Sequence, residues 1–276
     1  MDALALPEGR AAGGGAEIGV RLVRDSLPLV GTRVGGVEVE FFSEAPGEVA
    51  RPVGAAVTTA EGVATTTVKV PAKPGSYRFL ARLAQPESLP LSGDEEAVLL
   101  EVIPADRPLL FVLVPEAVSP DRRTGAQPRS AAALRQLASS RAVVYVATAE
   151  REPPSRLRAW LERNAFPPGP VLNLPATSPV TSPVTSPVTS PVTSEVRTGP
   201  GTAPQDLGEF LKQLDLSSRW KGDLWGVTRS RRNASALAFA GFRVVLLDAA
   251  GLEADGRTIF ALSSWDEARK KIESQR

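Results

Sequence analysis

The sequence predicts two domains, an all-β sandwich followed by an α/β domain with a doubly wound parallel sheet. Residues 16–104 contain short segments that alternate apolar and polar side chains between regularly spaced turns, a pattern typical of half-buried strands. Residues 105–276 instead alternate continuous apolar runs with helical spacings, which is typical of a parallel sheet covered by helices. The chain has 276 residues, enough to form two separate cores.

The N-terminal domain is expected to begin after a flexible lead. Residues 1–15 end in a run of three glycines, which offers no side chain for packing. The first strand then places Ile18, Val20 and Leu22 on one face. Because the following segments share this period and show no helical spacing, they favour a β-sandwich. The predicted strands lie at 18–22, 37–41, 55–59, 63–70, 77–83 and 97–103.

Two neighbouring segments of this domain carry a family resemblance. The run Val-Thr-Thr-Ala-Glu-Gly-Val-Ala-Thr begins at Val57, and Pro-Gly-Ser-Tyr-Arg-Phe-Leu-Ala begins at Pro74. Together they resemble the bacterial immunoglobulin-like modules, in which a Thr-rich Gly-x-Ala turn precedes a Gly-x-Tyr strand. The resemblance implies an Ig-like fold with Tyr77 and Phe79 in its core, and a role as a spacer or adhesion unit.

The second domain is organised around the apolar run at 109–114. These six large apolar residues lie between Pro108 and Pro115, which indicates a short strand buried on both faces. A helical spacing at 130–139 and a second apolar run at 142–147 complete a β-α-β unit, and this unit predicts a parallel pair of strands. Further helices are predicted at 155–164, 206–214, 230–240 and 264–276, and further strands at 171–174, 223–227 and 242–248.

A low-complexity insertion at 176–204 interrupts this domain. It repeats Thr-Ser-Pro-Val four times, and a proline at every fourth position excludes both a helix and a central strand. The composition therefore predicts an extended, solvated loop of polyproline type. Either the repeat is an expanded insertion without a function of its own, or it is a glycosylated or partner-binding loop.

The composition excludes several classes of chemistry. The chain has no Cys and no His, so it lacks disulfides, thiolate catalysis, cysteine zinc sites and the commonest general base. Its net charge of +1 gives no overall field for nucleic acid, and we expect no nucleic-acid partner and no cofactor. No apolar stretch approaches the roughly 20 residues of a membrane span. These features predict a cytoplasmic protein, or an extracellular one if the true N-terminus lies upstream.

Three segments of the second domain carry another resemblance. The first is the strand at 111–118. The second is the segment 144–149, together with the later stretches 158–161 and 166–169, and the third runs from 224 to 242. This arrangement resembles the haloacid dehalogenase-like superfamily, within it the lipin-type branch shared by phosphatidate phosphatases and the lipid-sensing domain of Nir-family phosphatidylinositol transfer proteins. The resemblance implies a Mg²⁺-dependent phosphatase site, in which one Asp attacks phosphorus and a second acts as acid and base.

The residues at the matched positions do not fit that chemistry. The two Asp positions of the resemblance hold Leu113 and Pro115, and the Asp that would bind the metal is Asn233. Glu116 is the nearby carboxylate, but strand alternation predicts that it points to the other side of the strand end. Thr148 stands at the phosphate-binding hydroxyl position. The family's third motif requires a Lys, and this chain offers two imperfect candidates, Lys212 and Lys221.

The sequence therefore predicts a pseudoenzyme, a binding or scaffold protein for a phosphate-bearing molecule or for a protein. Thr148 and the basic residues Arg229, Arg231 and Arg232 are candidates for anion binding, unless the basic run is only a solvated turn. Two alternatives stay open. One is a hydrolase with relocated chemistry, and the other is a surface or adhesion protein. The hydrolase would use the carboxylates of Glu116, Asp121 or Asp223.

Overall fold

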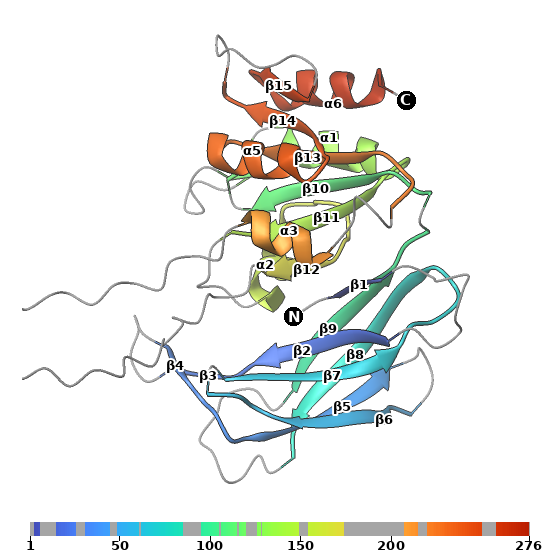
Figure 1. Ribbon diagram of the computed structural model, residues 1–276, viewed down its shortest axis with the longest axis vertical. Coiled ribbons are helices and arrows are strands. Elements are labelled where there is room, and N and C mark those ends of the chain that lie inside the picture. The colour runs from blue at the N-terminus through green and yellow to red at the C-terminus, as the bar shows by residue number, and fades with distance from the viewer. Residues whose placement is uncertain are drawn as a thin grey trace, which may run out of the picture.

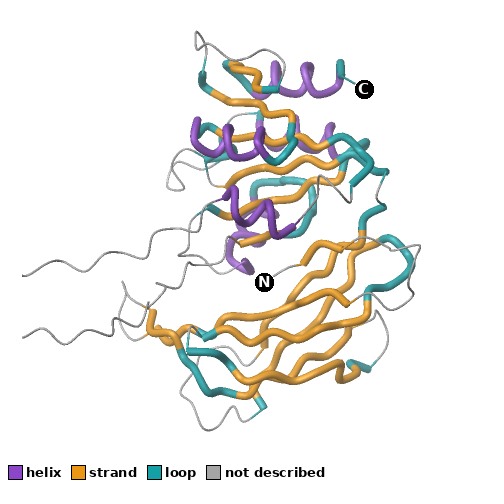
Figure 2. Tube along the Cα trace, viewed as in Figure 1, coloured by secondary structure: helices purple, strands orange, loops and turns teal. Residues whose placement is uncertain are grey.

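The computed structural model combines antiparallel sheets with a six-stranded parallel sheet (Figure 1). Helices lie in the part that holds the parallel sheet (Figure 2). The expectation of a β region followed by an α/β region is therefore confirmed at this level. The structure describes residues 3–5, 15–25, 31–44, 49–60, 62–84, 95–104, 106–114, 116–119, 126–127, 129–148, 154–173, 207–214, 220–249 and 258–275.

The antiparallel part is built from one larger and two smaller sheets. The larger sheet has five strands in the order β1-β9-β8-β5-β6, and β2 pairs with β7 while β3 pairs with β4. Ile18 and Ala64 of the β2–β7 pair share one apolar core with Phe41, Val98 and Leu100 of the larger sheet. The strands are β1 (Ala3–Ala5), β2 (Gly15–Arg21), β3 (Val23–Asp25), β4 (Gly31–Arg33), β5 (Glu38–Glu44), β6 (Arg51–Val57), β7 (Val63–Lys69), β8 (Gly75–Leu83) and β9 (Glu95–Val102).

Two elements of this part were not predicted from the sequence. The lead at 1–15 was expected to be flexible, but Ala3–Ala5 pair in parallel with Leu100 to Val102 as strand β1. Three residues suffice for backbone hydrogen bonds at a sheet edge, and they are too few to give a periodic signal. The short β3–β4 hairpin, which pairs Val23 with Arg33, was not predicted for the same reason.

Tyr77 ties the start of β8 to the preceding turn. Its hydroxyl donates a hydrogen bond of 2.7 Å to the carbonyl oxygen of Lys73, four residues upstream. We expect Tyr77→Phe to lower the free energy of unfolding by about 1 kcal/mol, because the carbonyl loses its partner while the ring stays. Urea unfolding measures this loss, with Tyr77→Ala as the control that also removes the ring. A Tyr77→Phe variant as stable as the wild type would contradict this role of the hydroxyl.

The parallel sheet has the strand order β12-β11-β10-β13-β14-β15, and every neighbouring pair is parallel. The strand at 109–114 is central, as its apolar run predicts, and all six of its residues are fully buried. The strands are β10 (Leu109–Val114), β11 (Ala142–Ala147), β12 (Val171–Asn173), β13 (Leu224–Thr228), β14 (Arg243–Leu247) and β15 (Ile259–Leu262).

Helices cover both faces of this sheet. Leu110, Val112 and Val114 belong to one apolar core with α1, α2 and α6, whereas Leu109 and Phe111 belong to a second core with α3 and α5. The alternation follows from the period of two along a strand. The helices are α1 (Ser130–Ala138), α2 (Pro154–Arg163), α3 (Leu207–Leu214), α5 (Arg231–Phe239) and α6 (Trp265–Glu273). Among the described residues, no helix is long and apolar enough to cross a bilayer.

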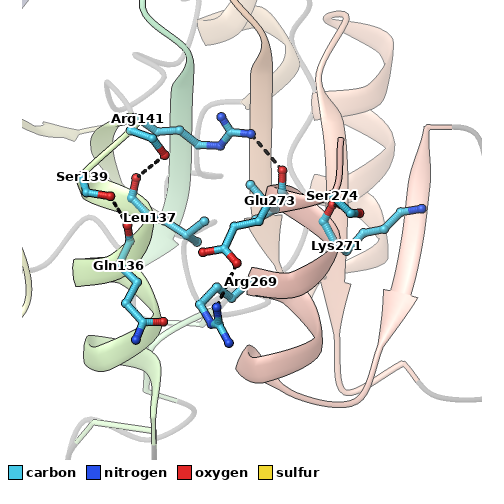
Figure 3. A network of polar contacts seen from close by, with 10 residues as sticks. Gln136, Leu137, Ser139, Arg141, Arg269, Lys271, Glu273 and Ser274 are labelled. Carbon is cyan, nitrogen blue, oxygen red and sulfur yellow. Dashed lines mark hydrogen bonds and ion pairs between the residues drawn. The ribbon is translucent and has the colours of Figure 1, made fainter. Parts of the chain in front are cut away.

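A buried arginine joins the first and last helices of this region (Figure 3). Arg141 is 2% exposed, and its Nη2 donates to the carbonyl oxygen of Ile272 at 2.9 Å. That carbonyl lies in the last turn of α6, where partial negative charge accumulates and a cation is favourable. Arg269 and Glu273 form a further ion pair of 2.8 Å on the same helix. The C-terminal helix is thus anchored on the end of α1.

Most predicted elements of this region are confirmed within a residue or two. Gly241 has a φ of +88° at the predicted helix-to-strand junction, and Ser264 caps α6 as expected. Strand β15 was not predicted, since Ile259–Leu262 is short and half-buried at the sheet edge. The insertion at 176–204 lies outside the described residues.

Candidate functional site

The strand order marks one point of the parallel sheet as the candidate site. The chain leaves β10 toward β11 on one side, and it later places β13 on the other side of β10. In doubly wound sheets, ligands bind outside the carboxyl ends of the strands at this switch point. The candidate site therefore lies among the residues that follow Val114 and Thr228.

Glu116 occupies this switch point. Its Oε1 accepts a hydrogen bond of 2.5 Å from the Thr228 hydroxyl and one of 3.0 Å from Nδ2 of Asn233. The prediction that Glu116 points away from the site is therefore wrong. Strand alternation ends at Val114, because the chain turns and Ala117 N–H donates to the carbonyl of Leu113 at 2.9 Å.

The N-terminus of α5 holds the partners of Glu116 in place. Ser230 has extended backbone angles, and its Oγ accepts from the N–H of Asn233 at 3.3 Å as an N-cap. The Ser230 N–H donates to Oγ1 of Thr228 at 3.1 Å, so this fully buried hydroxyl accepts one hydrogen bond and donates another to Glu116. A carboxylate held by a hydroxyl and an amide in this way has a fixed orientation.

Arg229 lies beside this group but faces a different carboxylate. Its Nη2 is 3.0 Å from Oδ2 of Asp248, and its side chain is only 16% exposed. The Nε–H of Arg229 is buried and has no acceptor among the described residues. Asp248 follows β14 with a φ of +57°, a left-handed conformation that Asp adopts more readily than most residues.

The other predicted site residues are only partly brought together. Leu113 is fully buried in the core beneath α3 and α5, and Pro115 and Asp121 lie outside the described residues. Thr148 lies at the same edge of the sheet, but its hydroxyl donates to the carbonyl of Val114 at 3.1 Å. The remaining predicted cations are exposed on the first turn of α5, namely Arg231 and Arg232.

Three predicted residues lie away from the carboxyl edge. Asp223 precedes β13, and its carbonyl accepts from the N–H of Leu109, the first residue of β10. Lys221 also precedes β13. Lys212 lies 5.8 Å from the ring of Phe239, at the far end of α5 from Asn233. Asp223 is therefore placed at the opposite edge from Glu116, and neither Lys joins the switch point.

No protein-family model matches this chain, and no curated protein matches it. Among the described residues, no group of three or more acidic, His or Cys side chains gathers where it could hold a metal ion. The switch point combines one carboxylate, one amide and one hydroxyl with a neighbouring Arg–Asp ion pair.

Sequence reasoning missed Thr228, Ser230 and Asp248. A usable signal was present, since Thr228 is the polar last residue of the buried strand β13 and Asp248 directly follows the buried strand β14. Polar groups at the carboxyl ends of adjacent parallel strands meet at one edge of the sheet. That rule does not give the pairing of these groups, and here Nη2 of Arg229 pairs with Asp248.

Tyr145 is a buried titratable group outside the switch point. Its hydroxyl donates to the carbonyl of Pro167 at 2.8 Å. Burial raises the pKa of Tyr145 far above its usual range, so this hydroxyl stays protonated and acts as a structural donor. It joins the 144–149 segment to the proline-rich turn that follows α2.

Proposed function

We propose that this chain is a pseudoenzyme, in which an immunoglobulin-like unit at 16–104 precedes a haloacid dehalogenase-like unit at 105–276 that binds a ligand without turning it over. The strand order around β10 and the bond between Tyr145 and Pro167 support the second resemblance. The bond from Tyr77 back to Lys73 supports the first, since a tyrosine of this kind is common in immunoglobulin-like sandwiches.

One observation carries the claim of inactivity. The carboxylate that the switch point presents after β10, Glu116, has Oε1 committed to Thr228 and Asn233. In the resemblance, Leu113 stands where the family has its attacking Asp, and this residue is fully buried and has no nucleophilic atom. A phosphatase accelerates the hydrolysis of phosphate monoesters by up to ~10²¹-fold over the uncatalysed reaction. Loss of the nucleophile alone lowers the rate of an enzyme by a factor on the order of 10⁴ to 10⁶.

The ligand proposed for this site is a phosphate-bearing molecule. Arg229 supports this choice, because its buried Nε–H has no acceptor among the described residues and a ligand oxygen would supply one. The exposed cations Arg231 and Arg232 add positive charge on the adjoining turn of α5. The relocated hydrolase is less well supported, since Asp223 sits at the opposite edge of the sheet.

A turnover assay tests the proposal. We expect the purified chain to release no phosphate from p-nitrophenyl phosphate or phosphatidate in Mg²⁺, and to broaden the ³¹P resonance of inorganic phosphate. The broadening should be lost in Arg229→Gln. Mg²⁺-dependent release that disappears in Glu116→Ala would overturn the inactive assignment. Absence of phosphate broadening both in the wild type and in Asp248→Asn, which lacks the carboxylate that pairs with Arg229, would overturn the proposed ligand.

A further inference from the structure

In the ion pair between Arg229 and Asp248, only one of the two nitrogens on one edge of the guanidinium has an acceptor among the described residues. Strands β13 and β14 are neighbours, so Arg229 and Asp248 extend from adjacent strand ends. Nε and Nη2 lie on the same edge of an arginine side chain, and this edge commonly holds two oxygens of one anion. Asp248 reaches Nη2 at 3.0 Å, while Nε has no acceptor among the described residues.

We propose that Asp248 is an internal competitor for the anion that Arg229 binds, so that it sets the affinity of the site. This inference rests on the proposed function, because it concerns the same guanidinium. The side chain of Asp248 is 48% exposed whereas that of Arg229 is 16% exposed, so the carboxylate is the partner that can turn out into water. Arg229 would stay in place and offer both Nε and Nη2 to the ligand.

Charge determines which ligands can displace Asp248. A carboxylate carries one negative charge and is already attached to the chain, so a free monoanion gains little by replacing it. A phosphate monoester group carries about −1.5 to −2 at pH 7 and has three acceptor oxygens, so it can occupy both nitrogens of the edge. Asp248 therefore acts as a filter that admits phosphate monoesters and rejects simple carboxylates and diesters.

The test compares variants in titrations with inorganic phosphate followed by ³¹P NMR. Asp248→Asn and Asp248→Gly both remove the carboxylate, and both tolerate the positive φ at this position. We expect each variant to bind phosphate about tenfold more tightly than the wild type. Adding Arg229→Gln to either variant should abolish the gain. Glu273→Gln is the matched control, because it removes one carboxylate from an ion pair on α6 and changes the net charge equally.

The outcomes separate this inference from the proposed function. If the wild type binds phosphate and neither Asp248 variant binds more tightly than Glu273→Gln, the competitor role is overturned and the site stands. A gain that survives Arg229→Gln overturns the role as well, since the effect would then come from the general charge. Acetate and dimethyl phosphate provide the selectivity arm. If Asp248 excludes monoanions, the binding of acetate and of dimethyl phosphate to the wild type should be undetectable, and it should rise in Asp248→Asn.

Discussion

Replacing Leu113 by Asp is expected to destabilise the α/β region strongly rather than to restore a catalytic group. Leu113 is fully buried, and it lies in the same apolar cluster as Val146 and Leu207. The substitution removes a large apolar side chain and places an unpaired carboxyl in the core, at a cost of about 4 kcal/mol or more. This is a large part of the 5–15 kcal/mol that typically stabilises a domain. Urea unfolding followed by tryptophan fluorescence measures the loss.

Leu113→Met is the matched control for this change. It keeps the volume and the apolar character of the side chain, so its cost should stay below about 1.5 kcal/mol. A Leu113→Asp variant as stable as the control would mean that the side chain can leave the core and reach the edge of the sheet. The same result would weaken the proposal that the chain is a pseudoenzyme, because that proposal relies on Leu113 being buried.

Replacing Trp265 by Ala is expected to cost about 3–5 kcal/mol, the range for deleting a large aromatic side chain from a core. Trp265 is 2% exposed at the start of α6. Its Nε1 donates to the carbonyl of Ala117 and to Oε1 of Gln127, both at 3.0 Å. Since Ala117 follows Glu116 directly, the variant should also disturb the carboxylate. Thermal unfolding checks the stability, and the side-chain amide resonance of Asn233 checks the site.

Trp265→Phe separates the two contributions of this residue. It keeps most of the buried apolar surface and removes only the indole donor, so the loss should be about 1–3 kcal/mol. If Trp265→Phe costs as much as Trp265→Ala, the hydrogen bonds rather than the packing hold the turn after β10. An unchanged Asn233 resonance in Trp265→Ala would show that the turn does not depend on this anchor.

The architecture of the α/β region could be read from the sequence because its signals are local and strong. A run of six apolar residues between prolines identified β10, and the alternation of such runs with helical spacings gave the parallel pairing of β10 with β11. The start of α6 was equally clear from the sequence. Ser264 was predicted as its N-cap, and its side chain accepts from the backbone N–H of Glu267, three residues later.

What the sequence could not provide was the direction of side chains beyond the strands. Glu116 was assigned by extending the alternation of β10, but a hydrogen-bonded turn begins directly after the strand. Its contacts with Thr228 and Asn233 join residues more than a hundred positions apart, and no local pattern encodes them. The same applies to the short strands β1 and β15, which owe their existence to the sheets that they extend.

The pairing of β10 with β13 has a consequence for how the chain reaches its native state. About 110 residues separate these neighbouring strands, so their contact forms late and the search for it slows folding. The entropy lost on closing such a loop grows only with the logarithm of its length, and shortening it by the span 176–204 would change the cost by about 0.3 kcal/mol. The number of Thr-Ser-Pro-Val repeats can therefore drift over generations with almost no thermodynamic penalty.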